Sequence, residues 1–158
     1  PHRMTFDQVT GELWVGEVGG GLREEINIIE RGGNYGWPFR EGFSAGPRSE
    51  PASYVGNLTN PVVDFLRTES NAIIGGYVYR GARHPGLYGK YICAGYSQNR
   101  IFAIERNAAT GTYSKSVIGS FAPGAAITFG QDHDRRDLHR PPERQYAALH
   151  AECDEPVA

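Results

Sequence analysis

The chain has 158 residues, with 16 Lys and Arg against 18 Asp and Glu, so its formal net charge is −2. This balance leaves no overall positive field for nucleic acid or an anionic membrane surface, and no apolar run reaches the ~20 residues of a membrane span. The 21 Gly and 10 Pro follow no Gly-X-Y period, which excludes collagen. Together with 9 Tyr, 7 Phe and 2 Trp, they favour an all-β domain over helical bundles and coiled coils.

The first 30 residues predict three short strands joined by tight turns. Residues 4–6 and 12–16 alternate in polarity around a turn at Gln8–Gly11, which is typical of a hairpin. A glycine loop at Gly19–Gly21 follows. Residues 24–29 then predict a third strand.

The middle and later parts of the chain predict a long loop followed by an antiparallel meander. Residues 39–60 contain Gly and Pro without hydrophobic periodicity, and loops of this length are usually functional or mobile. Further strands are predicted at residues 61–65, 72–80, 91–96, 100–105 and 113–118. Such a meander fits a sandwich, a barrel or propeller blades, and residue chemistry alone does not choose among the three.

The last residues differ from the rest of the chain. Residues 131–158 hold eleven charges and three of the five His, with few branched aliphatic side chains. Because this composition buries little, we predict disorder or a weak helix. His133 lies between two Asp residues, but its polar setting argues against a metal site. Cys93 and Cys153 lack metal-site spacing, and we interpret them as free thiols rather than one disulfide.

Several blocks of the chain match the pattern of one known family. The most specific are residues 32–38, Gly-Gly-Asn-Tyr-Gly-Trp-Pro, and the Glu-Glu-Ile-Asn run ahead of them. The chain therefore resembles the glucose/sorbosone dehydrogenase family, which comprises soluble pyrroloquinoline-quinone (PQQ) dehydrogenases of aldose sugars and hedgehog-interacting-like proteins. The matching blocks are residues 10–19, 24–27, 32–38, 75–81, 87–91 and 127–132, so the resemblance covers about residues 1–132.

The resemblance implies a six-bladed β-propeller, of which a chain of this length holds about two to three blades. We therefore expect residues 1–132 to be the C-terminal part of a longer propeller. Residues 133–158 depart from the family's continuation. We expect them to be disordered, or to arise from a frameshift or a mis-called gene end from about residue 134 onward.

For the intact family, the resemblance implies oxidation of an aldose at C1 with PQQ and calcium as cofactors and a His as general base. That His comes from earlier blades, so we assign no catalytic residue to this chain and expect it to be inactive on its own. The alternative is a non-catalytic propeller module that binds a protein or a glycan, as in the hedgehog-interacting-like relatives. No nucleophile–base pair or acid dyad stands out in the sequence.

The loop at Gly19 and Gly20 is the expected calcium site. By the resemblance, main-chain carbonyls at these positions bind the ion beside the quinone, and calcium accepts such oxygen ligands. The carboxylates of Glu17, Glu24 and Glu25 are further candidate ligands. The alternative is that these carboxylates face solvent on a short strand.

Arg100 is the candidate partner for the carboxylates of PQQ, which need cations. The family places a Lys and an Arg-x-Arg pair where this chain has residues 97–100 and 122–126, and Arg100 is the one cation in these two segments. This departure favours the non-catalytic alternative. Tyr35 and Trp37 are interpreted as a packed blade corner rather than a sugar platform.

For the intact family, the resemblance also implies a sugar substrate, a cytochrome-type electron acceptor and a periplasmic or secreted location. The sequence shows no signal-peptide pattern. We expect neither a nucleic-acid partner nor a membrane span.

Overall fold

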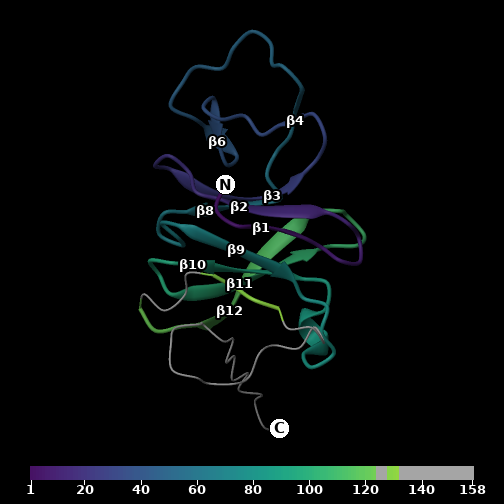
Figure 1. Cartoon of the computed structure of the whole chain (residues 1–158). Helices are drawn as coiled ribbons and strands as arrows, with labels where there is room; N and C mark the ends of the chain where they lie inside the picture. Colours follow the sequence, from purple (N-terminus) through teal and green to yellow (C-terminus); the bar gives the residue numbers. More distant parts are fainter. Residues whose placement is uncertain (124–127, 132–158) are drawn as a thin grey trace.

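The computed structural model describes residues 1–123 and 128–131, and these residues form stacked β-sheets with a 3-10 turn at Pro85–Leu87 (Figure 1). Two antiparallel sheets of four strands make up the body, with strand orders β1-β2-β3-β8 and β9-β10-β11-β12. The strands are β1 Met4–Phe6, β2 Leu13–Glu17, β3 Arg23–Ile29, β8 Val63–Leu66, β9 Ile73–Val78, β10 Tyr91–Gly95, β11 Arg100–Arg106 and β12 Tyr113–Ser120.

Each sheet is a meander that the local sequence explains. β1 and β2 form the predicted hairpin, whose turn contains Gly11 at φ 77°, a left-handed conformation that favours glycine. The turn between β10 and β11 contains Asn99 at φ 53°, and Asn tolerates this region better than most residues. The eight long strands lie within a few residues of the predicted ranges, which confirms the meander.

The two sheets pack face to face through an aromatic and aliphatic core. Trp14 stacks on Tyr91 with ring centroids 4.7 Å apart, and Phe65 meets Phe102 edge-on at 4.9 Å. Cys93 is buried in this core as a free thiol. The full cluster is Trp14, Ile26, Val63, Phe65, Ile73, Val78, Tyr91, Cys93, Phe102 and Ile104.

At one point the backbones of the two sheets approach so closely that a side chain has no room. A Cβ on Gly16 would lie 2.8 Å from the Gly75 nitrogen, and a Cβ on Gly75 would lie 3.0 Å from the Gly16 nitrogen. Beside this contact, the Thr5 hydroxyl donates a hydrogen bond to the Gly76 carbonyl at 2.6 Å. The Gly-Gly pair in β9 therefore marks a backbone contact between the sheets.

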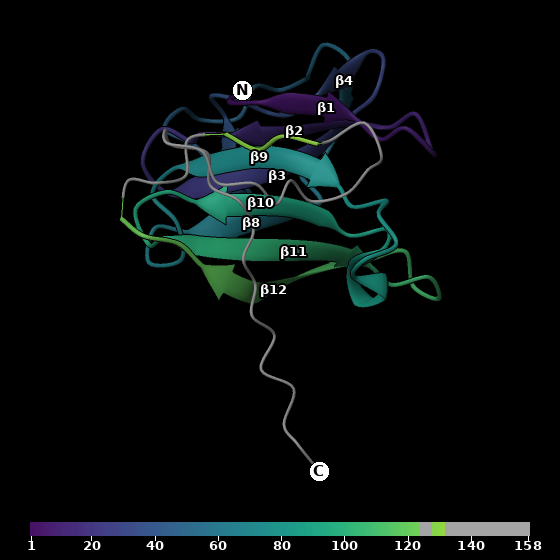
Figure 2. The ribbon, with the colours of Figure 1, turned by 60° about the horizontal axis from the view of Figure 1, so that its bottom comes forward.

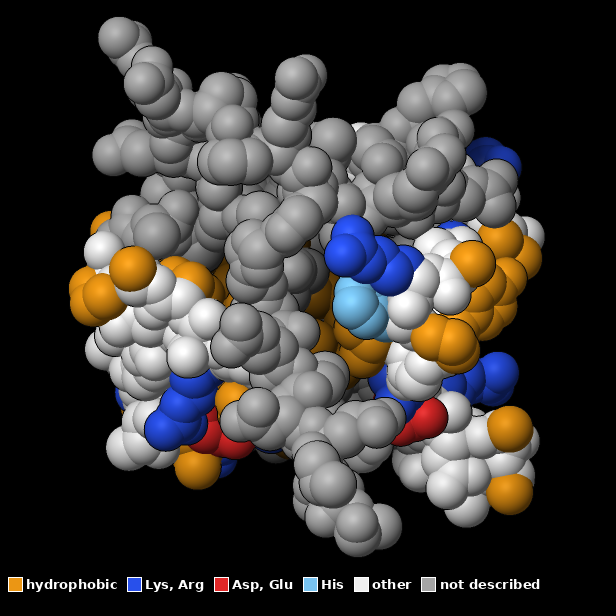
Figure 3. Space-filling view, turned by 90° about the horizontal axis from the view of Figure 1, so that it is seen from below, with side chains coloured by type: hydrophobic (Ala, Val, Ile, Leu, Met, Phe, Trp, Pro, Cys, Tyr) orange, Lys and Arg blue, Asp and Glu red, His pale blue; other side chains and the backbone are white. Residues whose placement is uncertain are grey.

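The second sheet is buried on its other face as well. Ile74 and Ala94 lie there, as do Ile92 and Ile101, and the partly buried Phe129 packs against both groups. Seen from this side, apolar side chains also reach the surface (Figure 3). A sheet that is apolar on both faces needs a neighbour on each side, as a blade within a propeller ring has.

These features identify two consecutive blades of a β-propeller and confirm the expected all-β, partial-propeller fold. The chain leaves the first sheet from its outermost strand, β8, and enters the second at β9, which packs against β1 and β2. Figure 2 shows the strands of the two sheets as superposed layers, with β9 beside β2. Four-stranded meanders that follow one another in this way are characteristic of propeller blades.

The predicted long loop is a folded excursion that covers the outward face of the first sheet (Figure 1). It runs from β3 to β8 and contains two small sheets. β4 (Gly33–Asn34) pairs in parallel with β7 (Asn57–Leu58), and β5 (Arg40–Glu41) pairs with β6 (Ser44–Ala45) in antiparallel fashion. The loop thereby brings Glu41 close to the glycine turn between β2 and β3.

The tail predicted at residues 133–158 lies outside the described residues, together with Cys153 and His133. The division of the chain at residue 132 therefore stays a prediction. Within the described part, no helix has the length and apolar character needed to cross a membrane.

A buried ion pair fastens the first hairpin to the segment that follows β9. Asp7 accepts two hydrogen bonds from Arg80, at 2.9 Å from Nε and 2.5 Å from Nη2, and its carboxylate is almost fully buried. Burial alone would raise the pKa of Asp7. The hydrogen bonds from Arg80, from the Thr10 hydroxyl and from the Val9 N–H outweigh it and lower the pKa to about 2.

We predict that Asp7→Asn lowers the free energy of unfolding by about 3 kcal/mol at neutral pH, because it leaves Arg80 without its counter-ion. Since the pKa of folded Asp7 is depressed, its stabilising effect is complete above the unfolded pKa of about 4 and is lost as the pH falls toward 2. Urea titrations across this acid range should show a steeper loss of stability in the wild type than in D7N. Parallel pH profiles for the two proteins would contradict the assignment.

Candidate functional site

Three loops meet at one end of the two sheets. The β2–β3 turn adjoins the β8–β9 loop, because Arg23 at the start of β3 lies opposite Leu66 at the end of β8. The β10–β11 turn is bonded to the same loop through Gln98, whose side chain donates to the Arg67 carbonyl at 3.2 Å and accepts from the Asn71 N–H at 3.1 Å. We call this the loop end of the sheets.

The residues predicted to bind a cofactor all lie at the loop end, although they belong to different sheets. Gly19 and Gly20 form part of the β2–β3 turn, and Arg100 begins β11. The side chain of Arg100 is exposed, and its backbone pairs with Gly95 and Ser120. The structure therefore brings the predicted residues to one end of the fold.

Arg67, which no sequence pattern revealed, lies at the centre of the loop end. Its guanidinium donates to Glu24 Oε1 and to the Asn71 carbonyl, both at 2.6 Å, and to the Gly19 carbonyl at 3.2 Å. Its Nη2 lies 3.8 Å from Glu41 Oε1. We call Gly19, Glu24, Glu41 and Arg67 the Arg67 cluster.

Glu24 is the buried member of the Arg67 cluster. Its side chain has no exposed surface and points between the two sheets. The carboxylate accepts hydrogen bonds from the Ile73 N–H at 2.8 Å and the Gly19 N–H at 3.3 Å, in addition to Arg67. Burial raises the pKa of Glu24 despite these bonds. Glu24 thus ties the β2–β3 turn to the first strand of the second sheet.

Glu41 reaches the same turn from the long loop. Its Oε1 accepts hydrogen bonds from three successive backbone N–H groups, those of Gly21, Leu22 and Arg23, at 2.7–2.9 Å. Burial opposes ionisation, but these bonds and the nearby Arg67 charge lower the pKa of Glu41. The carboxylate therefore holds the turn as an anion within a ring of backbone donors.

Trp37 from the long loop covers the same turn, whereas Tyr35 contacts the other end of β3. A Cβ on Gly20 would lie 2.4 Å from the Trp37 ring, so the half-exposed indole rests directly on this glycine. The Tyr35 hydroxyl donates to the Ile28 carbonyl at 2.9 Å and accepts from the Glu30 N–H at 2.7 Å. Tyr35 is thus packed as a corner residue, whereas Trp37 leaves 55% of its surface exposed.

The predicted carboxylate ligands are divided between two faces of the first sheet. Glu24 faces the second sheet, whereas Glu17 and Glu25 face the long loop, where the Asn27 amide donates to both at 3.2 Å. Glu25 also accepts from the Gly42 N–H at 2.6 Å, and burial raises its pKa. Asn27 Oδ1 is buried there without a hydrogen-bond partner. Among residues 1–123 and 128–131, no group of three or more His, Cys, Asp or Glu is placed to hold a metal ion.

The Arg67 cluster does not fit a calcium ion at Gly19. The carbonyl that the resemblance assigns to calcium accepts a hydrogen bond from a guanidinium, and a divalent cation beside that group would meet like charge. Arg67 already pairs with two carboxylates, those of Glu24 and Glu41. In the two segments where the resemblance expects cations for the carboxylates of a quinone, this chain has Arg100 alone, so the donor set does not match PQQ either.

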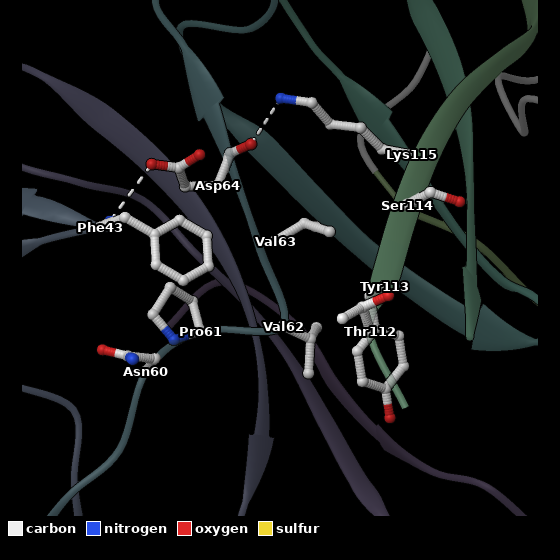
Figure 4. Close-up of a pocket in the computed structure, with 10 residues that line it drawn as sticks. All are labelled: Phe43, Asn60, Pro61, Val62, Val63, Asp64, Thr112, Tyr113, Ser114 and Lys115. Carbon is white, nitrogen blue, oxygen red and sulfur yellow. Dashed lines mark hydrogen bonds between the residues drawn. The ribbon is translucent and has the colours of Figure 1, made fainter. Parts of the chain in front are cut away.

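A separate groove of about 690 Å³ lies between β8 and β12, the outer strands of the two sheets (Figure 4). The side chains of Phe43 and Tyr113 lie on either side of it. Asp64 crosses its upper end, accepting from the Phe43 N–H at 3.2 Å and, through its carbonyl, from Lys115 Nζ at 2.5 Å. The sequence patterns did not indicate this groove, because its two walls are about fifty residues apart.

Known proteins share the architecture of this chain. A family model described as Glucose / Sorbosone dehydrogenase matches residues 1–122. The chain belongs to the glucose/sorbosone dehydrogenase family. The resemblance carried by the glycine turn and the blade motifs is thereby confirmed, and the match ends within the described part of the chain.

Two curated proteins that are similar to this chain come from Arabidopsis thaliana. The HIPL2 protein is 34% identical over an alignment that covers 88% of this chain, and the HIPL1 protein is 32% identical over 72% of it. The alignments cover 24% and 18% of those proteins. The chain therefore spans about a quarter or less of the curated relatives it matches.

Solved structures show the same fold. The PQQ-bound aldose sugar dehydrogenase of Streptomyces coelicolor matches with a TM-score of 0.53 at 23% identity, over 78% of this chain and 31% of that one. The apo form of the soluble aldose sugar dehydrogenase of Escherichia coli matches with a TM-score of 0.56 at 22% identity, over 73% and 33%. These matches cover about a third of each solved chain and show that the two sheets have the same fold as that third.

We predict that Glu41→Ala loosens the β2–β3 turn, because three backbone N–H groups lose their common acceptor. Amide hydrogen exchange at Gly21, Leu22 and Arg23 should accelerate by about tenfold, which corresponds to the loss of a typical net hydrogen-bond contribution. Glu41→Gln keeps the accepting oxygen and is the matched control, with a smaller acceleration. Unchanged exchange in Glu41→Ala would show that the turn is held by other contacts.

Proposed function

We propose that this chain forms two neighbouring blades of a glucose/sorbosone dehydrogenase-like propeller. In this proposal the intact propeller acts on an aldose at C1, and the loop end of this chain forms part of its central face. The observation that supports this proposal is the family match over residues 1–122. In this proposal residues 1–132 are the propeller part and residues 133–158 do not belong to its blades.

The chain itself takes no catalytic step in this proposal. The resemblance assigns the catalytic His to earlier blades, and the Arg67 cluster does not fit calcium at Gly19. The chain's own residues hold the loop end together. Glu24 joins the two blades by accepting the Ile73 N–H, and Glu41 holds the glycine turn by accepting the Gly21 N–H. PQQ and calcium, when bound by an intact relative, supply the oxidising centre and its Lewis acid.

The cellular setting follows from the same proposal. An intact protein of this kind would act in the periplasm or outside the cell, on a sugar substrate, and would pass electrons to a cytochrome-type acceptor.

A second candidate function is a non-catalytic module that binds a protein or a glycan. Two observations favour it: the Gly19 carbonyl is engaged by Arg67, and the groove between β8 and β12 presents aromatic side chains at Phe43 and Tyr113. Aromatic rings flanked by amide and hydroxyl groups suit sugar rings as well as peptide side chains. The similarity to the HIPL proteins agrees with this candidate.

We predict no sugar oxidation by the isolated chain. With PQQ, calcium and an aldose supplied, dye reduction should not exceed that of the heat-denatured protein, because no general base of the family lies in this part of the propeller. A soluble aldose sugar dehydrogenase serves as the positive control under the same conditions. Dye reduction that depends on both the sugar and the folded chain would refute the proposal.

A further inference from the structure

The Arg67 cluster contains the oxygen atoms of a cation site, with a guanidinium at its centre. Two carboxylates and one carbonyl face Arg67: Glu24 Oε1 at 2.6 Å, Gly19 O at 3.2 Å and Glu41 Oε1 at 3.8 Å. Carboxylate and carbonyl oxygens are the ligands that calcium prefers. The same atoms suit the planar fork of N–H donors of an arginine.

Arg67 is held in this position by its own loop. Its Nη1 also donates to the Asn71 carbonyl at 2.6 Å, and its backbone carbonyl accepts from the Gln98 amide at 3.2 Å. The loop is closed by the N–H groups of Glu69 and Ser70, which donate to the Leu66 carbonyl at 2.8 and 2.9 Å. The guanidinium is therefore oriented by the fold before it meets the glycine turn.

The charge in the cluster requires a cation. Glu24 is fully buried and Glu41 almost fully, and a buried carboxylate without a positive partner is costly. Arg67 supplies one positive charge to the two carboxylates, and the backbone N–H groups of residues 21–23 supply further donors to Glu41. Both carboxylates of the cluster therefore have hydrogen-bond donors among the described residues.

We propose that Arg67 is a built-in replacement for the calcium ion at the Gly19 turn. Its guanidinium takes the carbonyl and the carboxylates that would otherwise face the metal, so this turn folds without calcium and excludes it. The inference goes beyond the proposed function, because it concerns how the turn is held and stands whether or not an intact protein oxidises sugars.

The test follows the backbone amides of the turn by NMR in the full chain, with calcium added to millimolar excess and then removed with a chelator. In the wild type the signals of Gly19, Gly20 and Gly21 should not move, and the melting temperature should not change. Binding of calcium at Glu17 and Glu25 would move other signals and is distinguished by position. Calcium-dependent shifts at Gly19–Gly21 in the wild type would overturn the proposal.

Arg67→Ala removes the guanidinium and leaves the oxygen atoms in place. We expect the melting temperature to fall by about 10 °C without calcium, since a buried carboxylate loses its partner. Calcium should then restore a large part of this loss and shift the Gly19–Gly21 amides. A folded R67A protein that does not respond to calcium would reduce Arg67 to an ordinary ion pair and overturn the proposal.

Two further variants keep the test decisive. Arg67→Lys retains the charge with fewer donors, so its melting temperature should lie between those of the wild type and R67A, with no calcium response. Arg31→Ala removes an exposed arginine from the turn at the opposite end of β3 and is the matched control, with no shift in either measurement. If R67A does not fold in the absence of calcium, recovery of the folded spectrum on adding calcium supports the proposal, and failure to recover contradicts it. A calcium response in R67K equal to that of R67A also contradicts it.

Discussion

The buried carboxylate of Glu24 is the constraint from which the loop end of this molecule is built. It lies between the two blades with no exposed surface and accepts the N–H of Ile73, the first residue of the second sheet. A carboxylate in this position must have a positive partner, so the loop after β8 folds back to deliver Arg67. The same guanidinium then meets the Gly19 carbonyl. The buried charge of Glu24 thus holds the Gly19 end of the glycine turn through Arg67, while Glu41 holds the residues that follow.

Much of the strand pattern follows from local sequence. Alternation of apolar and polar residues with period two, and glycines at the turns, are short-range signals. The packing of the two sheets is compatible with the strands that they predict. The arrangement of the strands into blades is different. Sandwiches, barrels and propellers share these signals. What favours propeller blades here is that Ile74 and Ala94 are buried on the face of the second sheet that points away from the first. That property depends on sheet-to-sheet packing, and the family resemblance anticipated it where the pattern did not.

The site shows the same division between local and distant information. Glu24 and Glu25 are neighbours in one strand, so period two alone places them on opposite faces, and the structure does so. Arg67 and Glu41 carry no such signal. They reach the turn from 48 and 20 residues away in sequence, through loops whose course depends on the packed sheets. The one local hint for Arg67 is a cation directly after a predicted strand, at a sheet end already rich in acidic residues.

The position of Arg67 also affects how the stability of the glycine turn depends on ions in solution. A bound ion stabilises a fold according to the ratio of its free concentration to its dissociation constant. An arginine belongs to the chain and has no free concentration, so mass action does not act on it. The stability of a turn held in this way does not depend on the free calcium concentration through binding at this turn. The turn also cannot be loosened by removing a ligand, because the Arg67 side chain cannot dissociate from the chain as a bound ion can.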